Sequence, residues 1–88
     1  MVNQSVVVCH AEGLHLRPAG KFARLARGFQ SEITIRTGTK SLNGKQVVSI
    51  LSGNISMGDR IKIYCDGVDE DEALEALVCE LENGEGNN

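Results

Sequence analysis

The residues of this chain whose types and spacing could do chemistry lie between Gly13 and Ala19. His15 stands directly before an expected helix start, and Arg17 follows two residues later. The first N–H groups of a helix have no partner within the helix, and the helix dipole makes that end positive, so anions bind there. The positive end also disfavours a protonated imidazole, which keeps His15 neutral and nucleophilic. These features indicate a histidine that accepts a phosphoryl group, which the Arg17 guanidinium and the backbone N–H groups of Leu16 and Arg17 then bind.

Simpler interpretations exist for each of these residue types. A histidine at a helix start, taken alone, is more often a capping or surface residue. His10 has no comparable surroundings and is interpreted as the end of a strand. The carboxylates of Asp69 to Glu72 are explained by the preference of helix N-termini for negative charge. A small enzyme that uses His15 as a general base would need a further nucleophile, a metal site or a deep pocket, and the sequence indicates none of these.

A helix from Leu16 to Arg27 is expected to position the histidine and the arginine. Apolar residues recur in it at i, i+3, i+4 and i+7, which is typical of a helix with one buried face; they are Ala19, Phe22, Ala23 and Ala26. Pro18 fits the first turn, where its missing N–H costs nothing, and Gly28 follows the last periodic residue as a C-terminal glycine does. Another face carries basic side chains that either dock an acidic partner or simply face water; they are Arg17, Lys21, Arg24 and Arg27.

Charge is segregated along the sequence. The net charge is −3, yet all nine Lys and Arg residues lie between Gly13 and Lys62, together with only two acidic residues. From Ile63 onward the chain holds nine acidic residues and no basic one. Such asymmetry favours a charged docking face. Aromatic residues make up only 3% of the chain and tryptophan is absent, which argues against a nucleic-acid partner because base stacking needs aromatic rings.

The remaining apolar patterns alternate between strands and helices. Strands are expected at Ser5–Cys9, Glu32–Arg36, Ser41–Leu42 and Arg60–Asp66, and a further helix at Asp69–Leu81. The propensities of Lys45–Ser52 fit either a strand or a helix, and its apolar spacing and flanking glycines favour a short helix. Asp69 and Glu72 have the spacing of a capping box at the start of the last helix. The order βαββαβα predicts a single α+β domain over residues 1–88, with a four-stranded antiparallel sheet and the helices packed on one face. Residues 83–88 are expected to be a frayed tail.

The cysteines and the lengths of the apolar segments indicate in which cellular compartment the protein is expected. Cys9, Cys65 and Cys79 are too few and too irregularly spaced for a disulfide framework or a zinc site. All three fall on apolar positions, which predicts buried free thiols in a reducing environment. The start of the chain has no signal-peptide pattern, and no apolar run is long enough to insert in a membrane. We therefore expect a cytoplasmic protein with no metal and no cofactor.

The segment from Gly13 to Ala19 closely resembles the active-site signature of HPr, the histidine phosphocarrier family of the bacterial phosphoenolpyruvate:sugar phosphotransferase system. The resemblance implies the family's open-faced β-sandwich. It also implies that the ring Nδ1 of His15 accepts a phosphoryl group from phosphorylated Enzyme I and donates it to EIIA-type domains. The resemblance runs from Ser5 to Leu81 and includes the segments Asn43–Lys45, Gly58–Asp59 and Gly67–Leu77.

The resemblance further implies roles for residues around His15. Arg17 would stabilise the phosphohistidine. An apolar centre ringed by basic residues suits a transient docking surface, and its members would be Leu16, Lys21, Arg24, Arg27, Val47, Val48 and Leu51. The last three could equally be packed into the core. Such a carrier is expected to be a monomer with no nucleic-acid partner, and it catalyses no turnover of its own.

Three residues depart from the family pattern, namely Glu12, Leu16 and Gln46. Many members carry a regulatory serine where this chain has Gln46, so that switch is expected to be absent. Nearby Ser49 and Ser52 do not simply inherit it. The family often has a small polar residue in place of Glu12, and usually an alanine in place of Leu16. A carboxylate close to His15 would favour the imidazolium and oppose a phosphoryl group, unless it points into solvent.

Two uses of the carrier chemistry stay open. One is sugar uptake, and the other is a regulatory paralogue, as in nitrogen-type phosphotransferase chains, in which the phosphoryl group is a signal. The missing serine and the unusual neighbours of His15 keep the second use open. A different class is an interaction module in which His15 is incidental and the basic helix face binds a regulator.

Overall fold

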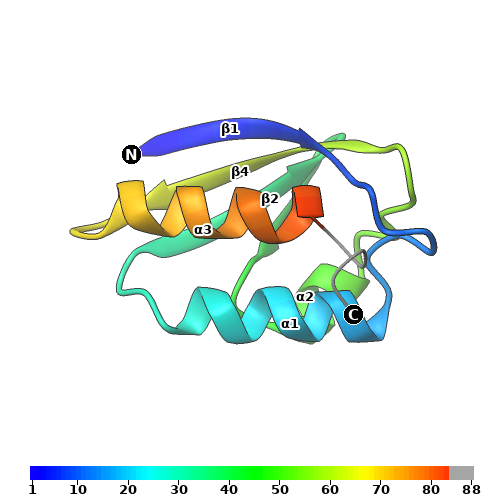
Figure 1. Ribbon diagram of the computed structural model, residues 1–88, viewed down its shortest axis with the longest axis horizontal. Helices are drawn as coiled ribbons and strands as arrows, with labels where there is room; N and C mark the ends of the chain where they lie inside the picture. The colour runs from blue at the N-terminus through cyan, green and yellow to red at the C-terminus, as the bar shows by residue number, and fades with distance from the viewer. Residues whose placement is uncertain (84–88) are drawn as a thin grey trace.

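Three helices cover one face of a four-stranded antiparallel sheet in the computed structural model, which describes residues 1–83 (Figure 1). The βαββαβα order and the α+β class expected from the sequence are confirmed. The expected frayed tail lies outside the described residues, apart from the residue that ends the last helix. The elements are β1 (Val2–Val7), α1 (Leu16–Arg27), β2 (Glu32–Thr37), β3 (Lys40–Asn43), α2 (Val47–Leu51), β4 (Arg60–Asp66) and α3 (Glu70–Asn83).

The strands lie in the order β1-β4-β2-β3, so the first strand pairs with the last one. Val6 lies opposite Ile61 in the β1–β4 pair, and Ile35 lies opposite Ile63 in the β2–β4 pair. Because side chains alternate between the two faces of a strand, these residues all point toward the helices. β1 begins at Val2 and ends at Val7 rather than spanning Ser5–Cys9, because it pairs along nearly the whole length of β4.

The core lies between the sheet and the helices, where α1 and α3 run across the same face (Figure 1). Each fully buried large apolar side chain contributes about 1.5–3 kcal/mol to folding. Alanines on the buried face of α1 allow that helix to approach its neighbours closely. The largest fully buried apolar side chains are Phe22 of α1, Ile35 of β2, Ile50 of α2, Ile61 and Ile63 of β4, and Leu77 and Leu81 of α3.

Carboxylates of the protein itself hold the start of α3. The Asp69 carboxylate accepts hydrogen bonds from the backbone N–H groups of Gln30 at 2.8 Å and Ser31 at 2.9 Å, and from the Ser31 hydroxyl at 2.6 Å. The Ser31 hydroxyl and these N–H groups lower the pKa of Asp69. Glu70 accepts a hydrogen bond from the Gly67 N–H at 3.1 Å, which lowers the pKa of Glu70. The loop before β2 is thereby tied to the start of α3.

Two local expectations are wrong. The capping box of Asp69 and Glu72 does not form, because the Asp69 carboxylate is taken up by the loop before β2. Only Cys65 is buried, whereas Cys9 and Cys79 are exposed and outside any disulfide. Cys9 lies just beyond β1, where the strand alternation turns it outward, and Cys79 lies on the solvent side of α3. Burial, and then the charges of Glu70 and Asp69, raise the pKa of the Cys65 thiol to about 11.

Candidate functional site

His15 is the N-cap residue of α1, and its side chain makes no capping hydrogen bond. Its backbone is extended, with φ −81° and ψ −169°, and no acidic residue occupies the first turn. Pro18 has no N–H group, and the Ala19 N–H donates to the His15 carbonyl at 2.9 Å. The N–H groups of Leu16 and Arg17 therefore lack a partner within the helix. The imidazole, 44% exposed, stands at an open and positive helix end.

Glu12 lies beside the His15 ring. Its Oε1 is 3.5 Å from the His15 Nε2. A carboxylate next to one ring nitrogen favours a proton on that nitrogen. In the neutral imidazole the other nitrogen, Nδ1, then keeps its free lone pair. The sequence left open whether Glu12 points into solvent or toward His15, and in the structure it contacts the ring.

The loop before α1 is locked against the segment that follows α2. The Leu14 N–H donates to the Ile55 carbonyl at 3.0 Å, and the Leu14 side chain is buried. Gly13 has a positive φ of 74°, and a Cβ there would lie 2.3 Å from the Ile55 carbonyl oxygen. Only glycine fits both the backbone conformation and this close approach. The loop is therefore fixed, and it holds the His15 ring in a defined place.

The structure separates the residues expected to dock partners. The basic side chains of α1 are all exposed, and Arg17 and Lys21 line a hollow of about 220 Å³ together with His15. Arg24 and Arg27, in the last turn, lie outside that hollow. The positively charged surface therefore begins beside His15 and continues along α1.

Apolar docking residues fall into two groups. Leu16 is 67% exposed and Val48 of the neighbouring helix α2 is 80% exposed. Val47 and Leu51 are half-buried and pack against the core. Of the three α2 residues that could be either core or surface, only Val48 is fully available to a partner.

Gln46, the residue expected to replace a regulatory serine, is the N-cap residue of α2, is exposed and makes no capping hydrogen bond through its side chain. The hydroxyls that follow it are engaged within the protein. Ser49 Oγ accepts a hydrogen bond from the Asn43 N–H at 2.8 Å, and Ser52 Oγ donates to the Ser49 carbonyl at 2.6 Å.

Two residues near His15 were not predicted to belong to the site. The interpretation of His10 as the end of a strand, with surroundings unlike those of His15, is wrong because β1 ends at Val7. His10 is only 4% exposed and lines the same hollow as His15, and its Nε2 has no hydrogen-bond partner among the residues that the structure describes. The inward alternation of Val6 and Val8 extends to His10, and that pattern could have indicated its burial. Asn54 lines a second hollow beside His15, and only tertiary structure brings it there.

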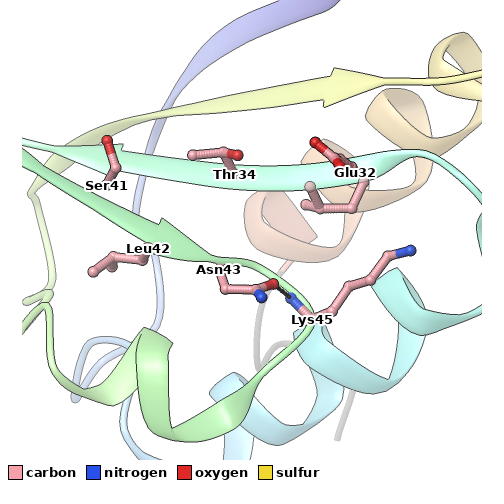
Figure 2. A pocket seen from close by; sticks show the side chains of 7 residues that line it. Glu32, Thr34, Ser41, Leu42, Asn43 and Lys45 are labelled. Atoms are coloured by element: carbon pink, nitrogen blue, oxygen red, sulfur yellow. Dashed lines mark hydrogen bonds between the residues drawn. The ribbon is translucent and has the colours of Figure 1, made fainter.

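A larger hollow of about 430 Å³ lies on the β2–β3 hairpin (Figure 2). It is lined by residues such as Glu32, Thr34 and Asn43, and Figure 2 shows the Asn43 Oδ1 accepting a hydrogen bond from the backbone N–H of Lys45 at 2.9 Å. The Lys45 amine donates to the Phe29 carbonyl at 2.8 Å. None of the residues that the sequence predicts for the site lines this hollow, so its size alone does not make it the functional site.

Within residues 1–83, no helix is long and apolar enough to cross a membrane. The described part of the chain also brings together no three side chains that could serve as metal ligands.

Fold and site together define a class: small open-faced α+β proteins that present a histidine at the open N-terminus of their first helix. Residues 2–83 match the family described as the PTS HPr component phosphorylation site. The phosphocarrier protein HPr of Haemophilus influenzae is 37% identical over 78 residues, which is 89% of this chain and 92% of that protein. The HPr-like protein Crh of Halalkalibacterium halodurans is 39% identical over 82 residues, which is 93% of this chain and 98% of that protein.

Solved structures agree with this match. The crystal structure of HPr-C-His from Thermoanaerobacter tengcongensis superimposes with a TM-score of 0.94 at 34% identity, covering 100% of this chain and 99% of that chain. The chain belongs to the HPr family of phosphocarrier proteins of the phosphotransferase system.

Proposed function

We propose that His15 accepts a phosphoryl group on Nδ1 from phosphorylated Enzyme I and passes it to EIIA-type domains for sugar uptake. The observation that carries the proposal is the placement of the ring. His15 caps an open helix end without using its side chain, and Glu12 lies 3.5 Å from Nε2, which leaves Nδ1 free to react.

The transfer needs little from the protein beyond position and charge. The Nδ1 lone pair forms the bond to phosphorus while the bond from phosphorus to the donor's nitrogen breaks, and the proton on Nε2 stays beside Glu12. The N–H groups of Leu16 and Arg17 and the Arg17 guanidinium then bind the phosphoryl oxygens. Because the phosphorus–nitrogen bond is labile, the same geometry allows onward transfer.

Docking is proposed to use the exposed parts of α1 and α2. Leu16 and Val48 supply an apolar centre, and basic side chains of α1 surround it, which suits partners with acidic surfaces. We further propose that the protein acts as a cytoplasmic monomer, a location that suits its free thiols. The basic residues of this docking surface are Arg17, Lys21, Arg24 and Arg27.

A regulatory paralogue is the second candidate. It is favoured by Gln46, a neutral side chain at the position of the family's regulatory serine, and by the presence of an HPr-like protein Crh among the relatives. In this alternative the phosphoryl group on His15 serves as a signal rather than as fuel for transport.

One experiment tests the carrier function. The protein is incubated with Enzyme I and phosphoenolpyruvate, and its intact mass is measured at neutral pH. We expect one added phosphoryl group, and none in His15→Ala. An unchanged mass in the wild-type protein, or a phosphoryl group that persists in His15→Ala, would falsify the proposal. The remaining hypothesis would then be an interaction module in which His15 is incidental. Offering the phosphorylated protein an EIIA of a sugar permease and a nitrogen-type EIIA separates the two candidates, because each predicts faster transfer to its own acceptor.

A further inference from the structure

Asn54 holds an unusual backbone conformation next to the proposed phosphorylation site. Its φ is +51°, and among the described residues no other non-glycine residue has a positive φ. This left-handed region costs L-residues about 1 kcal/mol or more, although asparagine tolerates it better than most. Glycine would adopt the same conformation without strain. An asparagine here therefore indicates that its side chain has a use.

The position of Asn54 relative to His15 is fixed by the neighbouring residue. The Ile55 carbonyl accepts the Leu14 N–H at 3.0 Å, and Gly13 packs directly against the same carbonyl. The turn that carries Asn54 is closed by its own N–H, which donates to the Leu51 carbonyl at 3.2 Å. The loop that ends in His15 and the turn that carries Asn54 are thus joined to each other through their backbones.

Asn54 lines a hollow of about 270 Å³ that also includes His15, Glu12 and Ser56. Arg17 lines the other hollow beside His15 and is absent from this one. The Asn54 side chain is exposed and forms no hydrogen bond within the described part of the chain. Its amide therefore offers two N–H donors to a group bound at the ring, from a different hollow than the Arg17 guanidinium.

We propose that the Asn54 amide donates a hydrogen bond to an oxygen of the phosphoryl group carried by His15, and thereby positions and protects that group. The inference rests on the proposed function, since it needs the phosphorylated histidine. A neutral donor suits a site where Glu12 already places a negative charge, because it binds the phosphoryl oxygen without pairing with the carboxylate. Asn54 is thus a positioning residue, distinct from Arg17, which supplies charge.

Asn54→Gly tests the proposal, because it removes the amide and keeps the favoured backbone conformation. The wild-type protein and the variant are phosphorylated, Enzyme I is removed, and the loss of the phosphoryl group to water is followed by intact mass. Loss of one neutral hydrogen bond predicts roughly two- to tenfold faster loss in the variant. The phosphorus NMR shift of the phosphohistidine is expected to move, while the melting temperature stays equal or rises.

Two further variants serve as references. Asn54→Asp keeps the shape and adds negative charge, so we expect faster loss than in Asn54→Gly. Gly38→Asn places an asparagine at another turn with a positive φ of 60° and open space around its Cα, and it should leave the phosphohistidine unchanged. If Asn54→Gly retains the phosphoryl group as long as the wild-type protein and shows the same phosphorus shift, the inference fails while the carrier function stands. If the wild-type protein accepts no phosphoryl group, both fail.

Discussion

The first and last helices begin in opposite ways. At the start of α1, His15 makes no side-chain cap, and the first turn holds no acidic residue. At the start of α3, three acidic residues occupy the first turn, and Asp69 and Glu70 accept hydrogen bonds from the surrounding backbone. One helix end is left open for an anion from outside, and the other is already neutralised by anions of the protein itself.

This difference separates a binding end from a structural end. Both helix ends carry partial positive charge and begin with N–H groups that have no partner within the helix. At α3 the Asp69 carboxylate lies at the helix start and fastens it to the loop before β2, by accepting hydrogen bonds from Ser31. At α1 no side chain of the described residues caps the helix end, and the proposed phosphoryl group would bind there.

Placing a carboxylate at the start of α1, as at the start of α3, should have the largest effect on stability and on phosphorylation. In His15→Asp the new carboxylate caps α1 as an aspartate at an N-cap does, adding about 0.5–2 kcal/mol of stability. For a domain of this size that corresponds to a rise in melting temperature of roughly 4–8 °C per kcal/mol. The variant should accept no phosphoryl group at all. Thermal unfolding and intact mass after treatment with Enzyme I check both results, and an unchanged melting temperature would show that this helix end is not vacant.

Weakening the last helix end should have the next largest effect. The pKa of Asp69 is lowered in the folded protein, so its ionised form stabilises the fold above the ordinary value of 3.8, and this contribution is lost as the pH falls through the lower folded pKa. Asp69→Asn should therefore be less stable at neutral pH and should lose less stability on acidification. Denaturant titrations at neutral and acidic pH measure both changes. Asp71→Asn, which removes a charge from the same turn, is the control and should show neither.

Removing the carboxylate that lies near the open end should have a smaller effect. Glu12 is exposed and 3.5 Å from His15, and exposed pairs contribute about 0.2–1 kcal/mol. Because a carboxylate opposes a nearby phosphoryl group, Glu12→Gln should shift phosphoryl exchange toward the variant, by at most about fivefold. Exchange with the wild-type protein through catalytic Enzyme I, read by intact mass, gives the ratio. Glu32→Gln changes the same charge on β2, and an equal shift in that variant would contradict a local role for Glu12.

The smallest expected effect is on the pKa of the Cys65 thiol, which lies near the acidic residues at the start of α3. Burial is the main cause of the raised pKa of Cys65, about 11, and Glu70 and Asp69 add to it. In folded protein at mildly alkaline pH, alkylation should modify Cys9 and Cys79 and spare Cys65. Glu70→Gln should lower the pKa of Cys65 only slightly, because burial remains. Peptide mapping after timed alkylation measures the rates, with denatured protein as the reference. Rapid alkylation of Cys65 in the folded protein would show that this thiol is not buried.

Local sequence patterns predicted the helices and strands well, but they did not predict the contacts between segments that are far apart in the chain. The bounds of α1 and β4 follow from periodicity within each segment, and the structure has them as expected, at Leu16–Arg27 and Arg60–Asp66. The approach of Glu12 to His15 could be raised as a question, because the two are three residues apart. The contact of Gly13 with Ile55 joins segments far apart in the chain, and no pattern of one segment reveals it.

The order of the strands in the sheet determines when, during synthesis, the site around His15 can form. His15 is made before the segments that hold its loop, because the strand that pairs with β1 is β4 and the carbonyl that accepts the Leu14 N–H belongs to Ile55. Pairing of such distant segments requires closing a long loop and is slow compared with helix formation. A nascent chain that has emerged only as far as Leu51 carries the histidine without the residues that hold it in place. Competence to accept a phosphoryl group should therefore appear only after Ile55 and β4 have been made, so shorter nascent chains would not draw on the donor.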